Sequence, residues 1–262
     1  MKSSTQTPTT LSARGISFGY RGEPLLEGFD IRIVSGDLLS IIGPNGGGKT
    51  TLLKVLAGQL VPQRGSVMID DKPLAYDRPA ATAQVLSYLP QFPTFPFSFT
   101  VADAVMQGAH PWSRGFFDTD SDRDRAIARL ESLGCAHLAE RDVSTLSGGE
   151  HKRVAIARTL TQDTPFVLLD EPYASLDLQH GIELSRLLAN LAEKGHAVCI
   201  TSHDINMALA FSSRILLMKD GAKVAEGLPL EVVTARTVRE TFGIDADIEY
   251  NKVTGKPFIV PG

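Results

Sequence analysis

The chain has 262 residues, of which 43% are hydrophobic and 21% charged, as in a folded protein with a substantial core. Its formal net charge of −4 argues against a nucleic-acid partner, which would call for a basic face. The two cysteines, Cys135 and Cys199, lie far apart and outside any CxxC spacing, so no disulfide framework is expected and a reducing cytoplasm is the expected compartment.

No apolar run approaches the ~20 residues that a membrane-spanning helix needs. The first ten residues are polar and do not resemble a secretory signal. We therefore expect residues 1–10 to be a disordered tail, and any work at a membrane to go through a partner protein.

The first third of the chain alternates short apolar runs with turns rich in glycine and proline. Strands are predicted at 15–20, 29–34, 37–43 and 65–70. A single helix is predicted at 49–60, where leucines recur at helical spacing.

The middle of the chain is helical in pattern and the last third is mixed. After a strand-like run at 85–90, we interpret residues 92–163 as a helical insertion. Strands return at 165–170 and 196–204, separated by a helix at 178–195. Apolar strands alternating with helices indicate a parallel sheet that is covered on both faces. A closing hairpin at 214–227 and two short helices within 228–244 complete the pattern.

The segment "GPNGGGKT", Gly43 to Thr50, is the strongest motif because it lies between an apolar strand and a helix. Its glycines let backbone N–H groups surround phosphates, and the helix N-terminus adds partial positive charge. In this GxxxxGK[ST] pattern Lys49 can reach the β- and γ-phosphates, and the Thr50 hydroxyl can coordinate Mg²⁺.

A second strand-end motif, "PFVLLDEP", supplies two carboxylates. Asp170 ends a buried strand, where P-loop NTPases place a carboxylate on the Mg²⁺ shell. Glu171 follows at once and can activate a water for attack on the γ-phosphate. The alternative, a solvated turn, becomes improbable next to the phosphate loop.

These motifs occur in one order: "GPNGGGKT", "YLPQ", "LSGGE", "LLDEP", "SLD" and "TSHD". Together they resemble the nucleotide-binding subunit of an ABC transporter, from Phe18 to about Phe242. "LSGGE" is the most specific element, since other P-loop NTPases lack it. The resemblance implies a RecA-like P-loop NTPase fold of the α/β class, with a mixed, mostly parallel sheet, an N-terminal antiparallel β region and an inserted helical subdomain. It implies one ABC ATPase domain over 11–262, with 11–91 and 164–262 as the catalytic core and 92–163 as the helical signature subdomain.

The resemblance also gives each motif a role in binding ATP and Mg²⁺. Glu171, His203 and Lys49 are the expected catalytic residues, and Thr50, Gln91 and Asp170 the expected metal site. Tyr20 is expected to stack on adenine, although an aromatic residue is also common in a strand. The alternative for His203 is a core histidine with satisfied hydrogen bonds. Its position after the two carboxylates favours the catalytic role instead. The expected nucleotide contacts are Tyr20, Gly43, Pro44, Asn45, Gly46, Gly47, Gly48, Lys49, Thr50, Thr51, Gln91, Ser147, Gly148, Gly149 and Asp177.

The segment "LSGGEHKRVAIAR" is a second helix start suited to an anion, which one chain does not need for its own ATP. The resemblance explains it: Ser147, Gly148 and Gly149 meet the γ-phosphate held by a second copy, with Asp177 at the interface. A homodimer that sandwiches two ATP molecules is therefore expected.

Details after the glutamine motif resemble importers of iron–siderophore complexes, haem and cobalamin, although His110-Pro111 stands in swapped order. The expected function is an ATPase that powers such an importer from the cytoplasmic face of the inner membrane. Its expected partners are transmembrane permease subunits and, indirectly, a substrate-binding protein. The alternatives are an importer of zinc, manganese or molybdate, a soluble ABC ATPase of the iron–sulfur assembly type, and a regulator that binds ATP without hydrolysing it. The last is disfavoured, because binding alone needs no Glu171.

Overall fold

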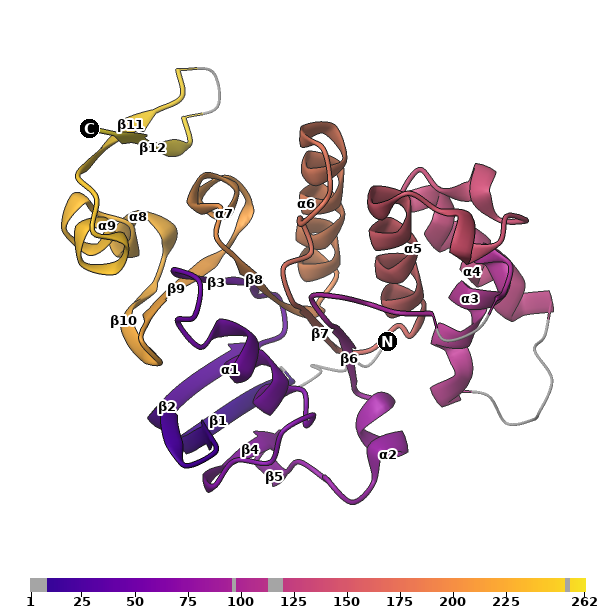
Figure 1. Ribbon diagram of the computed structural model, residues 1–262, viewed down its shortest axis with the longest axis horizontal. Helices are drawn as coiled ribbons and strands as arrows, with labels where there is room; N and C mark the ends of the chain where they lie inside the picture. Colours follow the sequence, from indigo (N-terminus) through magenta and orange to yellow (C-terminus); the bar gives the residue numbers. More distant parts are fainter. Residues whose placement is uncertain (1–8, 96–97, 113–119, 253–254) are drawn as a thin grey trace, which may run out of the picture.

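The computed structural model describes residues 9–95, 98–112, 120–252 and 255–262 (Figure 1). Its centre is a six-stranded sheet in the order β10-β9-β3-β8-β7-β6. The strands are β3 (Leu38–Ile42), β6 (Leu86–Leu89), β7 (Phe166–Leu169), β8 (Ala197–Ser202), β9 (Arg214–Lys219) and β10 (Ala222–Gly227). All neighbours from β9 to β6 run parallel, and β10 closes the sheet as an antiparallel hairpin with β9. The mixed, mostly parallel sheet predicted from the sequence is thus confirmed.

A second sheet of four antiparallel strands precedes the first in the chain. Its order is β2-β1-β4-β5, with β1 (Thr10–Tyr20), β2 (Glu23–Val34), β4 (Arg64–Ile69) and β5 (Lys72–Pro73). Thr10 already pairs with Val34, so the first strand begins inside the ten residues predicted as a tail. Residues 1–8 of that tail lie outside the described residues.

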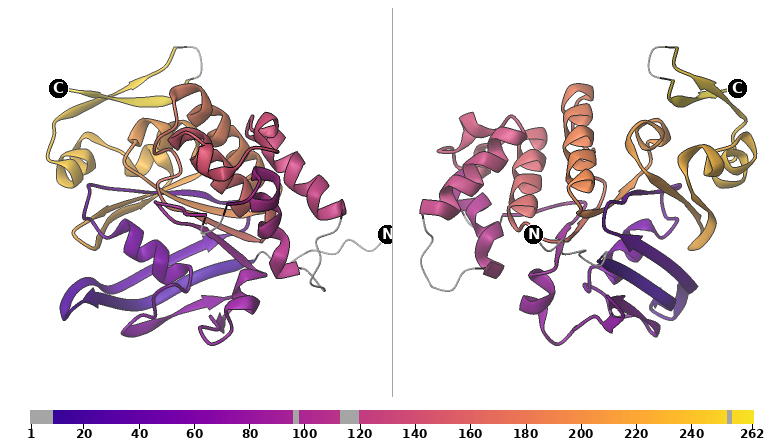
Figure 2. Two further views of the ribbon diagram at one scale, coloured as in Figure 1. Left: turned by 45° about the vertical axis from the view of Figure 1, so that its right-hand side comes forward. Right: turned by 180° about the vertical axis from the view of Figure 1, so that it is seen from behind.

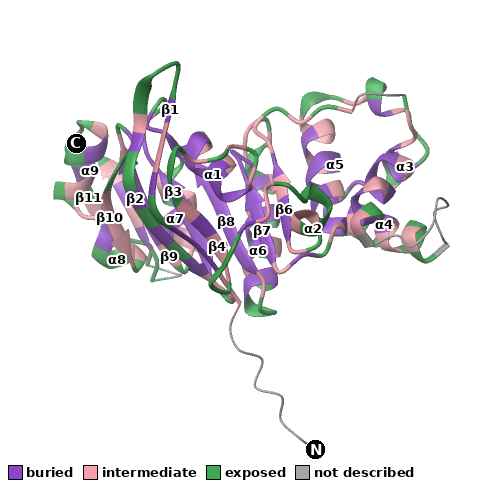
Figure 3. Cartoon of the chain, turned by 90° about the horizontal axis from the view of Figure 1, so that it is seen from below, coloured by how far each residue is buried: buried purple, intermediate pink, exposed green. Residues whose placement is uncertain are grey.

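The six-stranded sheet is covered on both faces (Figures 1 and 2). One face packs on α1 (Lys49–Leu56) and the antiparallel sheet, which together enclose an apolar core that includes Leu52, Phe166 and Cys199. The other face packs on α6 (Leu178–Glu193) and on the helices of the middle segment. Burial follows these layers, since the inner strands β3, β7 and β8 are buried along their whole length, whereas β10 at the edge of the sheet has no buried residue (Figure 3).

The segment between β6 and β7 contains helices in its described residues. It comprises α3 (Val101–Met106), η1 (Gln107–Trp112), α4 (Asp120–Ser132), η2 (Ala136–Leu138), η3 (Val143–Thr145) and α5 (Gly148–Thr161), while α2 (Pro79–Ala83) comes just before β6. In the phenylalanine-rich stretch ahead of α3, Phe95 and Phe99 pack against the core but Phe92 is 81% exposed. Among the residues that the structure describes, no helix has the length and apolarity to cross a bilayer.

The C-terminal segment adds one feature that the sequence did not predict. The helices α7 (Ile205–Phe211), α8 (Pro229–Val232) and α9 (Ala235–Phe242) are followed by a hairpin of β11 (Ala246–Tyr250) and β12 (Pro257–Pro261). The Asn206 side chain on α7 accepts a hydrogen bond from Ile259 N at 2.7 Å and donates to Ile259 O at 3.5 Å. The last strand is therefore held against the helix that follows the "TSHD" motif.

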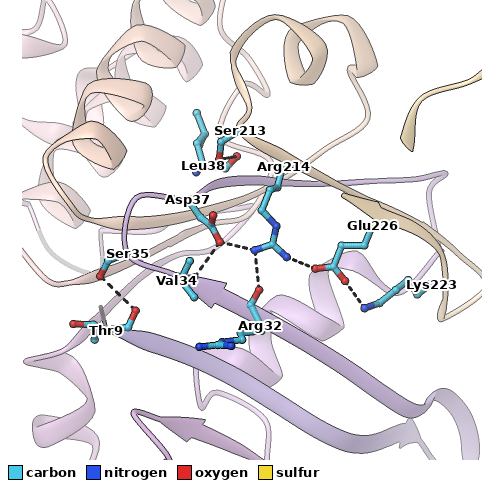
Figure 4. Close-up of polar contacts among 10 residues, drawn as sticks. All are labelled: Thr9, Arg32, Val34, Ser35, Asp37, Leu38, Ser213, Arg214, Lys223 and Glu226. Carbon is cyan, nitrogen blue, oxygen red and sulfur yellow. Dashed lines mark hydrogen bonds and ion pairs between the residues drawn. The ribbon is translucent and has the colours of Figure 1, made fainter. Parts of the chain in front are cut away.

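A polar network centred on Arg214 joins the two sheets at one edge (Figure 4). Its guanidinium donates to Asp37 Oδ2 and to Glu226 Oε1, each at 2.5 Å, and to the Arg32 carbonyl oxygen at 3.0 Å. Asp37 also accepts from Val34 N, and Lys223 pairs with Glu226. The start of β9 is thereby fixed to the start of β3, the strand that leads into the phosphate loop.

Candidate active site

The loop from Gly43 to Gly48 joins β3 to α1 and depends on its glycines. Gly46 and Gly48 have φ values of 79° and 90°, a region that strains residues with a Cβ. A Cβ on Gly43 would lie 1.9 Å from the Met218 carbonyl oxygen. The loop can therefore pack closely on β9, and it ends at the N-terminus of α1, where backbone N–H groups and the helix dipole favour an anion.

A cavity of about 320 Å³ lies over this loop. Gln91 from the end of β6 and Glu171 from the end of β7 reach it from neighbouring strands, and Leu25 borders it from the antiparallel sheet. The remaining lining residues are Asn45, Gly46, Gly47, Gly48, Lys49, Thr50 and Thr51. The structure thus brings most of the predicted nucleotide contacts to one cavity.

Lys49 is only 6% exposed, and its ammonium group donates to the carbonyl oxygens of Gly43 and Pro44 at 2.8 and 2.9 Å. Burial lowers the pKa of Lys49, and the nearby carboxylates Glu171 and Asp170 act against that shift. The lysine is thus held in the loop by neutral acceptors that a phosphate group can replace.

Asp170 is fully buried at the end of β7, where its two carboxylate oxygens differ sharply. Oδ1 accepts from the Thr50 hydroxyl at 3.0 Å and from the Thr201 hydroxyl at 2.6 Å. Oδ2 is also buried and has no hydrogen-bond partner. An unpartnered carboxylate oxygen in a buried site is costly unless another group satisfies it.

These residues suit Mg²⁺. A hydroxyl on Thr50 and the free Oδ2 of Asp170 are hard oxygen donors on the same side of the phosphate loop. Mg²⁺ typically binds through one or two such groups, several waters and substrate phosphates. The described residues contain no cluster of three or more His, Cys, Asp and Glu that could hold a metal ion by itself.

Glu171 follows Asp170 and faces the cavity with a strained backbone, at φ 46°. Its backbone N–H donates to the Thr201 hydroxyl at 2.9 Å, and its Oε2 lies 3.1 Å from His203 Nδ1. The Glu171 side chain is buried, whereas that of His203 is 69% exposed. A carboxylate oriented by an accessible imidazole is a suitable arrangement for activating a water molecule.

Gln91 lies two residues beyond the end of β6 and connects the cavity to the helical segment. Its side chain lines the cavity, while its carbonyl oxygen accepts from Lys152 Nζ on α5 at 3.0 Å. Burial lowers the pKa of Lys152 to about 8, opposed by the charges of Asp170 and Glu171. The glutamine motif and the signature helix are therefore in direct contact.

Tyr20 lies at the end of β1, half exposed. Its hydroxyl is 3.4 Å from the Thr51 hydroxyl, and its ring packs edge-to-face on Phe18 at 5.0 Å. The ring is thus beside the phosphate loop with a free surface.

The signature residues do not line the cavity of their own chain. Ser147 is the N-cap of α5, and a reciprocal capping box joins it to Glu150: Glu150 N donates to Ser147 Oγ, and Ser147 N donates to Glu150 Oε2. Ser147 and Gly148 are exposed, and no atom comes within 4 Å of a Cβ built on Gly148. Asp177 is likewise exposed, as the N-cap of α6, where bonds from His180 lower its pKa. One chain therefore presents a second, open helix start away from its phosphate loop.

Two residues at this site were not singled out from the sequence. Thr201 lies two residues before His203, and the pairing of Leu169 with Ile200 places it next to Asp170. Lys152 lies in the basic run of residues 151–153, a pattern typical of a solvated helix face, but it is only 4% exposed. The strand order would have revealed Thr201, whereas nothing in the local pattern indicates the burial of Lys152.

Comparison with known proteins agrees with this geometry. The sequence profile of the ABC transporter family matches residues 26–174. The chain is 42% identical to the hemin import ATP-binding protein HmuV of Gloeobacter violaceus, covering 96% of this chain and 94% of that protein. It is 34% identical to the ferric enterobactin transport ATP-binding protein FepC of Escherichia coli, covering 98% and 96%. The dimeric structure of the bacterial ABC transporter cassette MJ0796 superposes with a TM-score of 0.77 at 30% identity, covering 84% and 98%.

The chain belongs to the ABC transporter family. It is the ATP-binding cassette of that family, a transport-coupled ATPase with the P-loop NTPase fold predicted from the sequence. The names of the two relatives agree with the branch of the family that the sequence resembles.

Proposed function

We propose that this cassette hydrolyses Mg·ATP to power the uptake of an iron chelate, either a ferric siderophore or haem. The observation that supports hydrolysis is the cavity itself, which joins a phosphate loop to a buried carboxylate pair and an adjoining histidine. The chemistry of the cargo is supported by the similarity to HmuV and FepC, which cover almost the whole chain.

The residues divide the reaction between binding and proton transfer. Lys49 exchanges the carbonyl oxygens of Gly43 and Pro44 for the β- and γ-phosphates, and residues 45–51 surround them with backbone N–H groups. Thr50, Asp170 and Gln91 would hold Mg²⁺, which would neutralise the charge of the phosphates. The adenine stacks on the free face of Tyr20.

Glu171 accepts the proton of the attacking water. His203, at 3.1 Å, orients that carboxylate and contacts the γ-phosphate with its exposed ring. Because Glu171 is buried, the proton transfer takes place away from bulk solvent, where a fixed carboxylate is most effective.

The second copy completes the site. Ser147, Gly148 and Gly149 of one copy meet the γ-phosphate on the other, and Asp177 lies at the same interface. The exposure of Ser147 and Gly148 at this helix start supports the arrangement, since the open space beside Gly148 leaves room for the partner's phosphate next to the Ser147–Glu150 capping box. The dimeric cassette among the similar structures supports it as well.

Closure of the dimer is transmitted to permease subunits at the cytoplasmic face of the inner membrane, which receive the cargo from a binding protein outside. In this proposal residues 92–163 move as a helical unit against a core of 11–91 and 164–262, with Lys152 and Gln91 as one contact between them. The exposed Phe92 lies beside that contact and suits the permease surface.

The substitution Ser147→Arg tests the shared site. The isolated monomer should bind ATP as wild type does, because Ser147 does not line its cavity, while turnover should fall by about 100-fold or more as the arginine blocks the partner's γ-phosphate. Ser147→Ala removes the hydroxyl that caps α5 and faces the partner's γ-phosphate but adds no bulk, so it should reduce turnover less than the arginine does. Loss of ATP binding by the monomeric arginine variant would overturn the shared site. Growth of a deletion strain tests the cargo, with haem or a ferric siderophore as the sole source of iron, or with cobalamin supplied only from outside. Unimpaired growth on haem and siderophores would overturn the assignment of an iron chelate as the cargo.

A further inference from the structure

Thr201 is a buried polar residue at the centre of the hydrolysis site. It is the first residue of the "TSHD" motif, but neither that motif nor the mechanism above gives it a role. It lies near the carboxyl end of β8, between β3 and β7, and is 0% exposed. The parallel register pairs it with Ile41 on one side and brings it level with Asp170 on the other. Its hydroxyl therefore lies beside the carboxyl end of β7, which Asp170 and Glu171 follow.

The hydrogen bonds of this hydroxyl have only one possible direction. A backbone N–H can only donate, so Thr201 Oγ1 accepts from Glu171 N at 2.9 Å. Its single proton is then free to be donated to Asp170 Oδ1 at 2.6 Å. One side chain thus holds two consecutive residues of the site, one by its carboxylate and the other by its backbone.

The two bonds have different consequences. At Asp170, Oδ1 receives both Thr201 and Thr50, while the buried Oδ2 receives no donor. The carboxylate is therefore fixed with Oδ2 as the oxygen that would be free to hold Mg²⁺. At Glu171, the bond holds the N–H of a residue whose φ of 46° is strained for a side chain with a Cβ. Without it, that backbone could relax and carry the carboxylate away from the cavity.

We propose that Thr201 is a positioning residue for ATP hydrolysis: its hydroxyl sets the free oxygen of Asp170 toward Mg²⁺ and holds Glu171 over the cavity. This inference rests on the proposed roles of Asp170 and Glu171. It assigns Thr201 no contact with ATP, because it does not line the cavity.

Thr201→Val tests the proposal, since it keeps the shape of the side chain and removes the hydroxyl. Thr201→Ser keeps the hydroxyl and should restore function. Thr161→Val is the matched control: Thr161 is equally buried, but its hydroxyl bonds only to the Ala157 carbonyl oxygen of its own helix. Steady-state hydrolysis gives kcat and KM, and binding of a fluorescent ATP analogue is measured in EDTA and then with Mg²⁺.

For Thr201→Val we expect kcat to fall roughly 10–100-fold with KM changed less than about threefold, and the gain in analogue affinity on adding Mg²⁺ to be lost. Binding in EDTA should equal that of wild type, and Thr201→Ser and Thr161→Val should behave as wild type. A kcat and Mg²⁺ response close to wild type in Thr201→Val would overturn the proposal. So would weaker binding in EDTA, a failure of Thr201→Ser to restore function, or an equal loss in Thr161→Val, since each indicates a general structural defect.

The failure of the proposed function gives a different result. If Glu171→Gln retained full turnover, Glu171 would not be the base, yet the Mg²⁺ response of analogue binding in Thr201→Val would still report on the link between Thr201 and Asp170. If wild type bound no ATP analogue, the proposed function itself would be wrong.

Discussion

Glu171→Gln separates the chemistry of the carboxylate from its position. The amide has nearly the volume of the carboxylate and can still form a hydrogen bond to His203, but it cannot accept a proton from water. The backbone bond from Glu171 N to Thr201 is unaffected by the substitution. The contact with His203 is partly screened, because that ring is 69% exposed, so its change should alter folding stability by no more than about 1 kcal/mol.

The expected loss in turnover is far larger than the loss in stability. A positioned general base contributes typically about 10²–10⁴-fold. At about 1.4 kcal/mol for each factor of ten, this raises the barrier by roughly 3–5 kcal/mol. ATP binding should persist, because the lysine, the phosphate loop and the Asp170 carboxylate are unchanged. The variant should therefore accumulate as an ATP-bound dimer.

Phosphate release at saturating Mg·ATP measures the turnover, and size-exclusion chromatography with and without ATP measures the dimer. Glu183→Gln makes the same chemical change on the exposed side of α6, where the Glu183 carboxylate accepts a hydrogen bond from the Gln179 side chain, and it should leave turnover unchanged. Turnover in Glu171→Gln within about threefold of wild type would refute the assignment of the base.

Two further predictions concern the framework of the site. Gly43→Ala should abolish ATP binding, because the new Cβ would lie 1.9 Å from the Met218 carbonyl oxygen. Gly47→Ala should bind ATP nearly as wild type does, since the closest contact of its Cβ is 3.1 Å. Equal affinities of the two variants in an equilibrium binding assay would contradict this prediction. Arg214→Met should destabilise the fold by about 2 kcal/mol, less than the 3–5 kcal/mol of a fully buried pair because the arginine is 26% exposed. This corresponds to a Tm lower by about 4–8 °C in thermal unfolding, and an unchanged Tm would show that the network contributes little.

The phosphate loop and both strand-end carboxylates could be predicted from the sequence, because their chemistry is local. A strand, a glycine loop and a helix start must be contiguous to surround a phosphate, so "GPNGGGKT" carries its own context. Asp170 and Glu171 directly follow an apolar strand, so a short segment of sequence is enough to predict their place as well. Thr201 and Lys152 could not be predicted, since each acts through a residue distant in the chain: one needs the order of β7 and β8, the other the packing of α5 against β6.

The sequence by itself determined the class of fold, the order of the motifs and the identity of the chemical groups, because strand and helix periods and glycine requirements are properties of short segments. It also showed that two helix starts suit an anion. Only the tertiary structure decided which groups meet. It placed Gln91, Lys49 and Glu171 around one cavity and left Ser147 exposed outside it. It also left one oxygen of Asp170 without a partner, because the strand order brings Thr50 and Thr201 to the other.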